Sequence, residues 1–343
     1  MTERAAGSAS DRADYPSDPW DLLAETSRTF YLSICKLPGD VGRVLCVAYL
    51  LLRVSDFFED SAALEATEKL RWLERWYDAL GGEPLSTDWS AQIAAIGATE
   101  VDVAAAQRAP MILAEFEALP EDIREPVRRH VRDSTAGMIR WINRGPYVVT
   151  EHDLDDYMHE VAGRVGYLST EVFAWGSPAI ARRKRELMSL AREAGLALQT
   201  VNVLRGIRKD YQRGWVYIPT SYFQQADLNP HQMFEPAYHQ RALQIVNVLA
   251  NKAERHLHSA IEYAQTIPRS EQRVRRACLW PFLFAAATVG VSRNNPEVLF
   301  GEAKISRAQI RRIVRATTLF GWSNKFISWY FSRLVLGNGT MSF

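Results

Sequence analysis

Apolar residues recur at helical spacing along most of the chain. In residues 20–34, 70–80 and 245–264 they return every three or four positions, the spacing that places them on one face of an α-helix. No sustained alternation of apolar and polar residues, bounded by turn residues, indicates a β-strand. The pattern therefore predicts an all-α protein.

Helix-breaking residues divide this pattern into helices of ordinary to long length joined by short links. The breaks fall at Pro38-Gly39, Gly81-Gly82, Gly145-Pro146, Gly176-Ser177, Pro219, Pro268 and Asn294-Asn295-Pro296. Short links favour antiparallel neighbours, and the sequence contains no internal repeat of fixed period. We expect one helical bundle with a central cavity, since bundles form ligand and metal sites from side chains on facing helices.

Three segments stand out at the ends and in the apolar part of the chain. Residues 1–18 are rich in Ser, Asp and Ala and are predicted to be a disordered leader, which leaves residues 19–343 as one domain. Residues 277–291 are apolar but too few to cross a bilayer, so they are predicted to be a core helix. Residues 327–336 mix aromatic residues with one Arg, and two interpretations stay open: a packed terminal helix, or a segment that rests on a membrane surface.

The overall charge is nearly balanced, with 41 Lys and Arg residues, 40 Asp and Glu residues and a net charge of +1. No global field attracts nucleic acid, so an anionic ligand must be bound locally. Cys35, Cys46 and Cys278 lie in apolar helical patterns without the spacing of metal ligands. We therefore expect buried, reduced thiols and a cytoplasmic location, with peripheral membrane contact left open.

The first segment with candidate chemistry is RVSDFFED, residues 53–60, which ends an apolar helical run. Asp56 and Asp60 are four residues apart, so both carboxylates lie on one helix face, where they can share Mg²⁺ ions with a substrate phosphate. Arg53 lies one turn earlier. The alternative interpretation is an acidic helix end on the protein surface.

The second segment is GLALQTVNVLRGIRKD, residues 195–210. Gln199, Asn202, Gly206 and Asp210, with Arg205 beside them, fall near one stripe of a helix, opposite apolar residues. Amides within an apolar sequence indicate a stripe that faces a polar cavity. The alternative is an exposed helix with stray amides.

With these two segments the chain resembles the squalene/phytoene synthase family. Residues 27–30 (SRTF), 52–60 (LRVSDFFED), 156–166 (DYMHEVAGRVG), 197–205 (ALQTVNVLR) with 217–219 (YIP), and 294–305 (NNPEVLF and AKI) match the family's elements in the family's order. The last of these is similar to the squalene synthases rather than to the shorter phytoene synthases. The resemblance implies the class I isoprenoid synthase type of all-α bundle.

The resemblance also implies roles for individual residues. Three Mg²⁺ ions are expected, and their ligands are Asp56, Asp60, Asn202 and Asp210. The residues expected to bind the diphosphate are Ser27, Arg28, Arg53, Arg205 and Arg213. Two further catalytic candidates are Tyr157 and Glu160, and the residues expected in the cavity are Phe30, Phe57, Gln199 and Gly206. The implied reaction is Mg²⁺-dependent ionisation of an allylic isoprenyl diphosphate, with farnesyl diphosphate favoured. Two chains would then be joined head to head to give presqualene diphosphate, or squalene if NADPH is used.

Three departures from the family's pattern bear on the product. Gly206 stands where the second aspartate motif has its first Asp, so that Asn202, Gly206 and Asp210 resemble the metal triad of class I terpene cyclases. Glu160 replaces a Tyr, and it can act as a base or pair with Arg164.

The third departure weighs against NADPH use. Ser306 and Trp215 occupy positions where reducing members carry basic residues. Arg213, Arg307 and Arg311 are close enough in sequence to substitute for them.

Two other functions stay open at this point. One is a terpene cyclase or prenyltransferase that uses a single prenyl diphosphate on the same scaffold. The other is a non-catalytic isoprenoid-binding protein, against which the retained Asp56, Asp60, Asn202 and Asp210 argue, since a binding protein needs no metal ligands.

Overall fold

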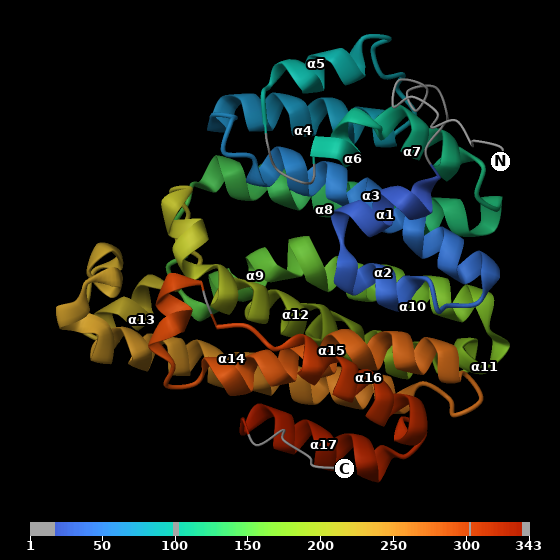
Figure 1. Cartoon of the computed structure of the whole chain (residues 1–343). Helices are drawn as coiled ribbons and strands as arrows, with labels where there is room; N and C mark the ends of the chain where they lie inside the picture. Colours follow the sequence, from blue (N-terminus) through green and yellow to red (C-terminus); the bar gives the residue numbers. More distant parts are fainter. Residues whose placement is uncertain (1–17, 99–102, 302, 338–343) are drawn as a thin grey trace, which may run out of the picture.

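The computed structural model describes residues 18–98, 103–301 and 303–337, with the exception of the side chain of Arg28 (Figure 1). Within these ranges every regular element is helical, and one isolated bridge joins Tyr147 to Val216. The all-α prediction is confirmed. The predicted leader lies outside the described residues except for Asp18, whose carboxylate accepts a hydrogen bond from the Trp20 backbone N–H and caps the first helix.

The described α-helices, in chain order, are α1 (Pro19–Thr26), α2 (Arg28–Ile34), α3 (Gly39–Asp60), α4 (Ala66–Leu80), α5 (Trp89–Ala95), α6 (Val103–Gln107), α7 (Ala109–Glu117), α8 (Glu121–Arg144), α9 (Glu151–Met158), α10 (Arg164–Gly176), α11 (Pro178–Ala181), α12 (Lys184–Gln212), α13 (Thr220–Gln225), α14 (His239–Thr266), α15 (Gln272–Ser292), α16 (Arg307–Phe320) and α17 (Asn324–Val335). A π-helical turn, η1 (His159–Gly163), links α9 to α10. Short 3₁₀ helices are η2 (Pro230–Phe234), η3 (Pro236–Tyr238) and η4 (Pro296–Phe300).

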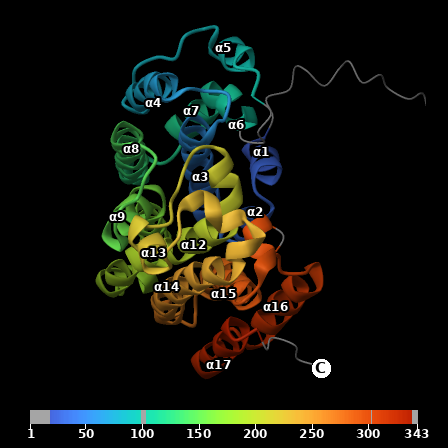
Figure 2. The ribbon, with the colours of Figure 1, turned by 90° about the vertical axis from the view of Figure 1, so that its left-hand side faces the viewer.

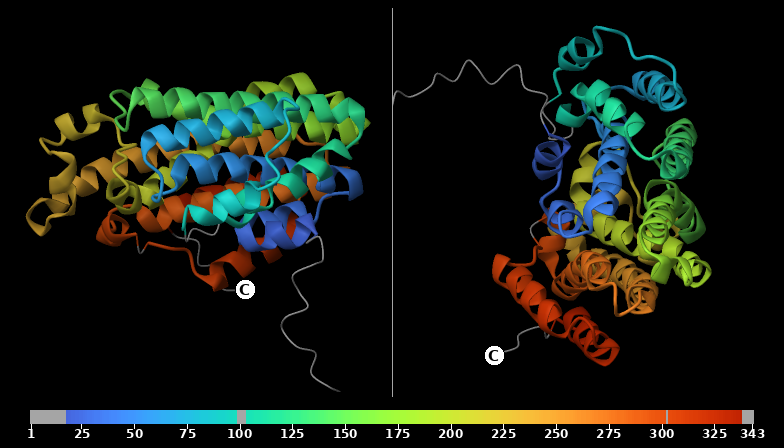
Figure 3. Two further views of the ribbon diagram at one scale, coloured as in Figure 1. Left: turned by 90° about the horizontal axis from the view of Figure 1, so that it is seen from above. Right: turned by 90° about the vertical axis from the view of Figure 1, so that its right-hand side faces the viewer.

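The long helices pack side by side around one core. Helix α12 packs against α10 and α14, α14 packs against α15, and α3 packs against α8. Helices α4 to α7 cover α3 and α8 on one side, and α16 with α17 forms the opposite edge (Figures 2 and 3). The arrangement confirms the predicted helical bundle.

Glycines allow η1 and α10 to approach α12 closely. A Cβ at Gly195 would lie 2.2 Å from the Ala162 carbonyl oxygen, and one at Gly166 would lie 2.0 Å from the Ala191 carbonyl oxygen. Real Cβ atoms do not approach backbone this closely, so only glycine fits at these contacts. This packing fixes α12, which carries the second candidate segment, against η1.

Helix α15 contains a long apolar run and lies in the interior of the fold. By length and composition it could cross a membrane, but 78% of its most apolar window is buried inside the protein. The predicted core helix is confirmed, although it begins at Gln272 rather than at residue 277. The earlier start is stabilised by the buried Arg275 guanidinium, which donates hydrogen bonds to the carbonyl oxygens of Gly321, Gln265 and Ile267.

The C-terminal segment forms helix α17, which packs against α14 and α15 through one face. The packed-helix interpretation is therefore confirmed for that face. The prediction of buried thiols is correct for Cys46 and Cys278, where burial raises each thiol pKa to about 12. It is wrong for Cys35, which is exposed at the end of α2.

Candidate active site

A cavity of about 820 Å³ lies in the middle of the bundle. Its walls come from α2, α3, η1, α10, α12 and α15, with contributions from α9, α14 and η4. This volume is in the upper part of the range that small-molecule sites occupy. The expected central cavity is present.

The two longest walls change from apolar to polar in the same direction. Along α3 the lining runs from Leu45 and Leu52 to Asp56 and Asp60, a distance of about 22 Å at the helical rise per residue. Along α12 it runs from apolar residues near Leu198 to polar residues at the C-terminal end. The cavity therefore has one long apolar part and one polar end.

The two candidate segments meet at that polar end, through Arg213. Its guanidinium contacts the Asp60 carboxylate at 2.7 Å and the Asp210 carboxylate at 2.6 Å. Asp56 forms an ion pair with Arg53 at 2.7 Å. The structure thus brings Asp56, Asp60 and Asp210 together, as expected. Arg213 lines the cavity, but its guanidinium forms ion pairs with two carboxylates. The sequence interpretation had predicted that Arg213 binds the diphosphate.

Glu59 is a site residue that the sequence interpretation did not single out. Glu59 comes between Asp56 and Asp60 in the sequence, and it too lines the cavity. Its side chain is buried, and its Oε1 atom has no hydrogen-bond partner within the described part of the chain. Burial first, and then the charges of Asp60 and Asp56, hold its pKa well above the ordinary value. Burial likewise raises the pKa of Asp210 to about 6, although Arg213 opposes the shift.

The donor set at this end fits a shared cation rather than a closed metal cage. Among the described residues no group of three His, Cys, Asp or Glu side chains is arranged to hold a metal alone. Mg²⁺ is usually bound by one or two carboxylates, with water and substrate phosphate completing its octahedron. Asp56, Asp60, Asn202 and Asp210 line the cavity with oxygen ligands of the required kind. The Glu59 Oε1 atom, which has no hydrogen-bond partner in the described residues, lies at the same end. Its raised pKa favours the neutral carboxyl, and a bound cation would favour the ionised form.

The polar stripe of α12 is present as predicted. Gln199, Asn202, Arg205, Gly206 and Asp210 all line the cavity, and the Asn202 amide donates to the Gln199 side-chain oxygen at 3.2 Å. A Cβ at Gly206 would lie 2.7 Å from the Asp210 Oδ2 atom. A larger residue at this position therefore has to move the Asp210 side chain.

Cations surround the polar end. Arg53 and Arg205 line the cavity as predicted, and Arg208, Lys209 and Lys304 line it as well. Arg208, Lys209 and Lys304 were not predicted as site residues. Arg208 and Lys209 lie on the same helical turn as Asp210, and this proximity in sequence could have indicated them.

At the first helical element the structure corrects one prediction and adds a residue. Ser27 does not line the cavity; its Oγ atom accepts a hydrogen bond from the Phe30 backbone N–H at 3.2 Å and caps α2. The side chain of Arg28 lies outside the described part of the chain. Ser33, six residues after Ser27, lines the cavity, and its buried Oγ has no hydrogen-bond partner in the described residues.

Tyr157 lies in an aromatic wall of the cavity. Its hydroxyl donates to the Tyr217 hydroxyl at 3.0 Å, and the two rings stack with centroids 4.5 Å apart. The Trp215 and Tyr217 rings also stack, with centroids 5.5 Å apart. Burial raises the pKa of both tyrosines well above the ordinary value, so both stay neutral.

Glu160, predicted as catalytic, does not line the cavity. Its carboxylate pairs with Arg164 at 2.5 Å and Arg140 at 3.1 Å, in the space left by the missing side chain of Gly137 on α8. Glu160 lies on the side of η1 that faces Gly137 of α8, whereas Val161 and Ala162 of the same turn line the cavity. The ion-pair interpretation of Glu160 is the correct one.

The sequence interpretation also expected Phe57 in the cavity, and the structure places it elsewhere. Phe30 lines the cavity and packs against Tyr49 with ring centroids 5.4 Å apart. Phe57 is 1% exposed, does not line the cavity, and packs edge-on against Phe58 at 5.3 Å. As the immediate neighbour of Asp56 it points to a different side of α3 and belongs to the core.

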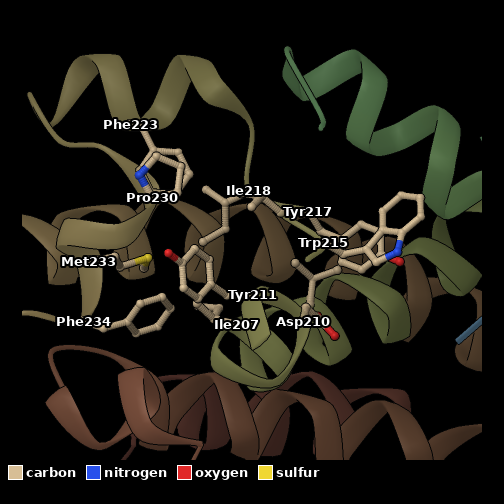
Figure 4. Close-up of a pocket in the computed structure, with 12 residues that line it drawn as sticks. Ile207, Asp210, Tyr211, Trp215, Tyr217, Ile218, Phe223, Pro230, Met233 and Phe234 are labelled. Atoms are coloured by element: carbon tan, nitrogen blue, oxygen red, sulfur yellow. The ribbon is translucent and has the colours of Figure 1, made fainter. Parts of the chain in front are cut away.

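A second, much smaller pocket of about 10 Å³ lies behind the polar end (Figure 4). It is lined by Ile207, Tyr211, Trp215, Ile218 and Phe234, among others, and it has room for about one water molecule. The segment after α12 therefore packs against the back of the helix end that carries Asp210, and supports it from outside the cavity.

Comparisons with known proteins agree with this fold. Residues 23–313 match the family model for squalene/phytoene synthase. The human squalene synthase is 27% identical over 293 residues, which cover 84% of this chain and 66% of the human protein. The squalene synthase of Saccharomyces cerevisiae is 29% identical over 312 residues, covering 88% and 67%. This chain thus spans about two thirds of the length of these relatives.

The solved structure of TcSQS in complex with a ligand has the same fold, with a TM-score of 0.80 and 23% identity over 92% of this chain and 90% of that one. That likeness shows the fold alone. The family match extends over most of the chain, including both aspartate-bearing segments and all the long helices of the cavity. The chain belongs to the squalene/phytoene synthase family.

Proposed function

We propose that this protein is a transferase that ionises an allylic prenyl diphosphate and joins two such chains head to head. The observation that carries the proposal is the large central cavity, with a long apolar part and a polar end where carboxylates of α3 and α12 meet. A molecule with an apolar chain and an anionic head group is complementary to both parts. Farnesyl diphosphate is the proposed substrate, and presqualene diphosphate or squalene the proposed product.

The polar end would bind the diphosphate together with Mg²⁺. Asp56, Asp60, Asn202 and Asp210 would hold the metal, which neutralises charge on the leaving diphosphate when bound. Arg53 and Arg205 offer planar donor groups suited to phosphate oxygens. Arg213 would keep Asp60 and Asp210 in place before the substrate arrives, since it contacts both carboxylates.

The apolar part would protect the carbocation that ionisation leaves behind. Leu45, Leu52, Phe173 and Phe282 line this part and exclude water from the reactive carbon. Tyr157, Tyr217 and Tyr263 also line the cavity, and aromatic rings stabilise a nearby cation through their π faces. A neutral Tyr157–Tyr217 pair adds no charge that would trap the cation as an adduct.

The direct test is to incubate the purified chain with farnesyl diphosphate and Mg²⁺ and to measure pyrophosphate and organic products. We expect pyrophosphate release that stops when EDTA is added, and a product containing both chains. Release of pyrophosphate at the same rate with EDTA would contradict the metal-dependent step.

Adding NADPH is expected to change neither the rate of pyrophosphate release nor the identity of the product. Ser306 caps α16 through its Oγ, Trp215 stacks on Tyr217, and Arg213 is occupied by two carboxylates. Arg307 and Arg311 lie on the exposed face of α16 and do not line the cavity. A fork-like Arg is the best partner for the 2′-phosphate of NADPH, and near these positions the cavity offers only the point charge of Lys304. Squalene that forms only when NADPH is present would overturn this prediction.

A terpene cyclase that uses one prenyl diphosphate is the second candidate, because Asn202, Gly206 and Asp210 line the cavity with the spacing of a cyclase triad. Gly206→Asp restores the family's residue and adds a carboxylate next to Asp210. We expect it to lower the Mg²⁺ concentration for half-maximal pyrophosphate release severalfold.

Gly206→Ala is the matched control for this variant. It introduces the Cβ that crowds the Asp210 Oδ2 atom without adding a charge, and both substitutions remove a helix-interior glycine, worth up to about 1 kcal/mol. An unchanged Mg²⁺ dependence and product spectrum in Gly206→Asp would show that the glycine does not set the chemistry.

A further inference from the structure

The polar end of the cavity carries more positive than negative charge. Among the described residues, the carboxylates that line the cavity are Asp56, Glu59, Asp60 and Asp210. The cations that line it are Arg53, Arg205, Arg208, Lys209, Arg213 and Lys304. Six cations against four carboxylates leave an excess of two positive charges before any metal binds. A wall with excess positive charge attracts an anion and repels a further metal ion.

Four of the six cations have no carboxylate partner in the described part of the chain. Arg53 forms an ion pair with Asp56. Arg213 forms ion pairs with Asp60 and Asp210. The cations without such a pair are Arg205, Arg208, Lys209 and Lys304. Their charge is therefore available to an anionic ligand.

Lys209 lies on the face of α12 that was expected to bind metal. It follows Asn202 by seven residues and Gly206 by three, the helical spacings that place side chains on one face. The Asp210 carboxylate occupies the space beside Gly206, since a Cβ at that position would lie 2.7 Å from the Asp210 Oδ2 atom. This face therefore presents one carboxylate and one ammonium group, where the family's second aspartate motif presents two carboxylates.

Arg208 is held in place by aromatic rings instead of by a carboxylate. Its guanidinium carbon lies 5.3 Å from the centroid of the Phe234 ring and 5.6 Å from that of the Phe300 ring. Phe300 itself lines the cavity. Cation–π contacts restrain the side chain without cancelling its charge. The planar guanidinium thus remains able to donate paired hydrogen bonds to phosphate oxygens.

We propose that Arg205, Arg208 and Lys209, which we call the cationic turn, bind a diphosphate group directly and replace one of the three Mg²⁺ ions expected from the sequence. The site then binds pyrophosphate without any divalent metal. When Mg²⁺ is present, two ions accompany the diphosphate instead of three. The nature of the anion rests on the proposed function, in which the remaining metal would still be needed for ionisation.

The 2′-phosphate of NADPH is another anion that such cations attract, and it fits the cationic turn less well. The carboxylates of Asp56 and Asp60 line the same end of the cavity. A diphosphate that shares Mg²⁺ with these carboxylates satisfies them and the cations together. A lone 2′-phosphate would leave both carboxylates facing another anion.

The test is isothermal titration of pyrophosphate into the full chain in buffer that contains EDTA. We expect one pyrophosphate to bind per chain, more weakly at high salt. Arg208→Met and Lys209→Met should each raise the dissociation constant about tenfold, because each removes a charged partner of the anion. Arg185→Met is the matched control. It removes an exposed cation from the same helix, outside the cavity, and should bind like the wild type.

The number of bound metal ions distinguishes replacement of a metal from a general attraction for anions. Mg²⁺ bound at saturating pyrophosphate is measured by equilibrium dialysis, and we expect two ions per wild-type chain. Gly206→Asp/Lys209→Met adds a carboxylate and removes the ammonium group on the same face. This variant should bind a third ion, and its dissociation constant for pyrophosphate in EDTA should rise at least about tenfold.

Four results would overturn the proposal. They are no pyrophosphate binding by the wild type in EDTA, three Mg²⁺ ions per wild-type chain, unchanged pyrophosphate binding in Lys209→Met, and displacement of pyrophosphate by NADPH but not by NADH. The last result would assign the cationic turn to the nucleotide. Lys209 is exposed, so its variant is expected to fold even if Arg208→Met does not, and circular dichroism checks both.

The outcome is separable from that of the proposed function. Product formation that requires Mg²⁺, without pyrophosphate binding in EDTA, would reject the cationic turn and leave the proposed function intact. Pyrophosphate binding in EDTA without formation of any product from farnesyl diphosphate would support the cationic turn and count against the proposed function.

Discussion

Replacing Asp60 by Asn is expected to lower the rate of pyrophosphate release from farnesyl diphosphate by about 10²–10³-fold. The substitution keeps the size of the side chain and removes a carboxylate at the polar end of the cavity, where the proposed reaction would have to neutralise the charge of the leaving diphosphate. It also removes one of the two partners of Arg213. Asp56→Asn is expected to act in the same direction, because Asp56 lines the same end.

The control is Asp40→Asn, which removes an exposed carboxylate from the first turn of the same helix. That variant should lose little stability, about 0.3–1 kcal/mol from the helix dipole, and should keep its activity. Folding of all three variants is compared by circular dichroism and urea unfolding. If folded Asp60→Asn releases pyrophosphate at the wild-type rate, the assignment of the polar end is wrong.

Replacing Lys252 by Met is expected to lower the free energy of unfolding by about 3–5 kcal/mol. Lys252 is 1% exposed on α14, and its ammonium group contacts Glu151 at 3.0 Å and Asp155 at 2.6 Å on α9. Without it, two carboxylates lose a buried positive partner. We expect a loss of stability near the lower end of this range. The Glu151 side chain is 41% exposed and the Asp155 side chain is 27% exposed, so both carboxylates keep some contact with water.

Arg255→Met on the same helix is a closely matched control. Arg255 contacts the same Glu151 carboxylate at 2.8 Å but is 61% exposed. Exposed ion pairs contribute about 0–1 kcal/mol, so this variant should unfold at nearly the wild-type urea concentration. Equal losses in the two variants would show that burial does not determine the strength of this network.

The sequence predicted the fold class and the two halves of the site because each depends on local spacing. Helical periodicity gave the all-α bundle, and the i,i+4 relation of Asp56 and Asp60 gave one wall of the polar end. The polar stripe of α12, including Asn202 and Gly206, was predicted for the same reason. Each of these features is decided within a few helical turns.

Other features depend on how distant segments meet, and the sequence could not give them. Arg213 looks like a diphosphate ligand in sequence, but only the placement of α3 and α12 around the same cavity shows that two carboxylates hold it. Glu160 was misplaced because its side chain faces Gly137 and Arg140 of α8, a contact between distant segments of the chain. Lys252 lies in a sequence that resembles a solvated helix face, yet it is buried because α9 brings two carboxylates to it.

The central claim, that two prenyl chains are joined in this cavity, is tested most directly by crossed isotope labelling. The wild-type protein is incubated with Mg²⁺ and an equal mixture of unlabelled and fully deuterated farnesyl diphosphate, and the products are analysed by mass spectrometry. We predict a product that contains one chain of each kind, together with the two products made from like chains. Products that each derive from a single chain, with pyrophosphate released and no mixed species, would contradict the account and identify a terpene cyclase on this scaffold.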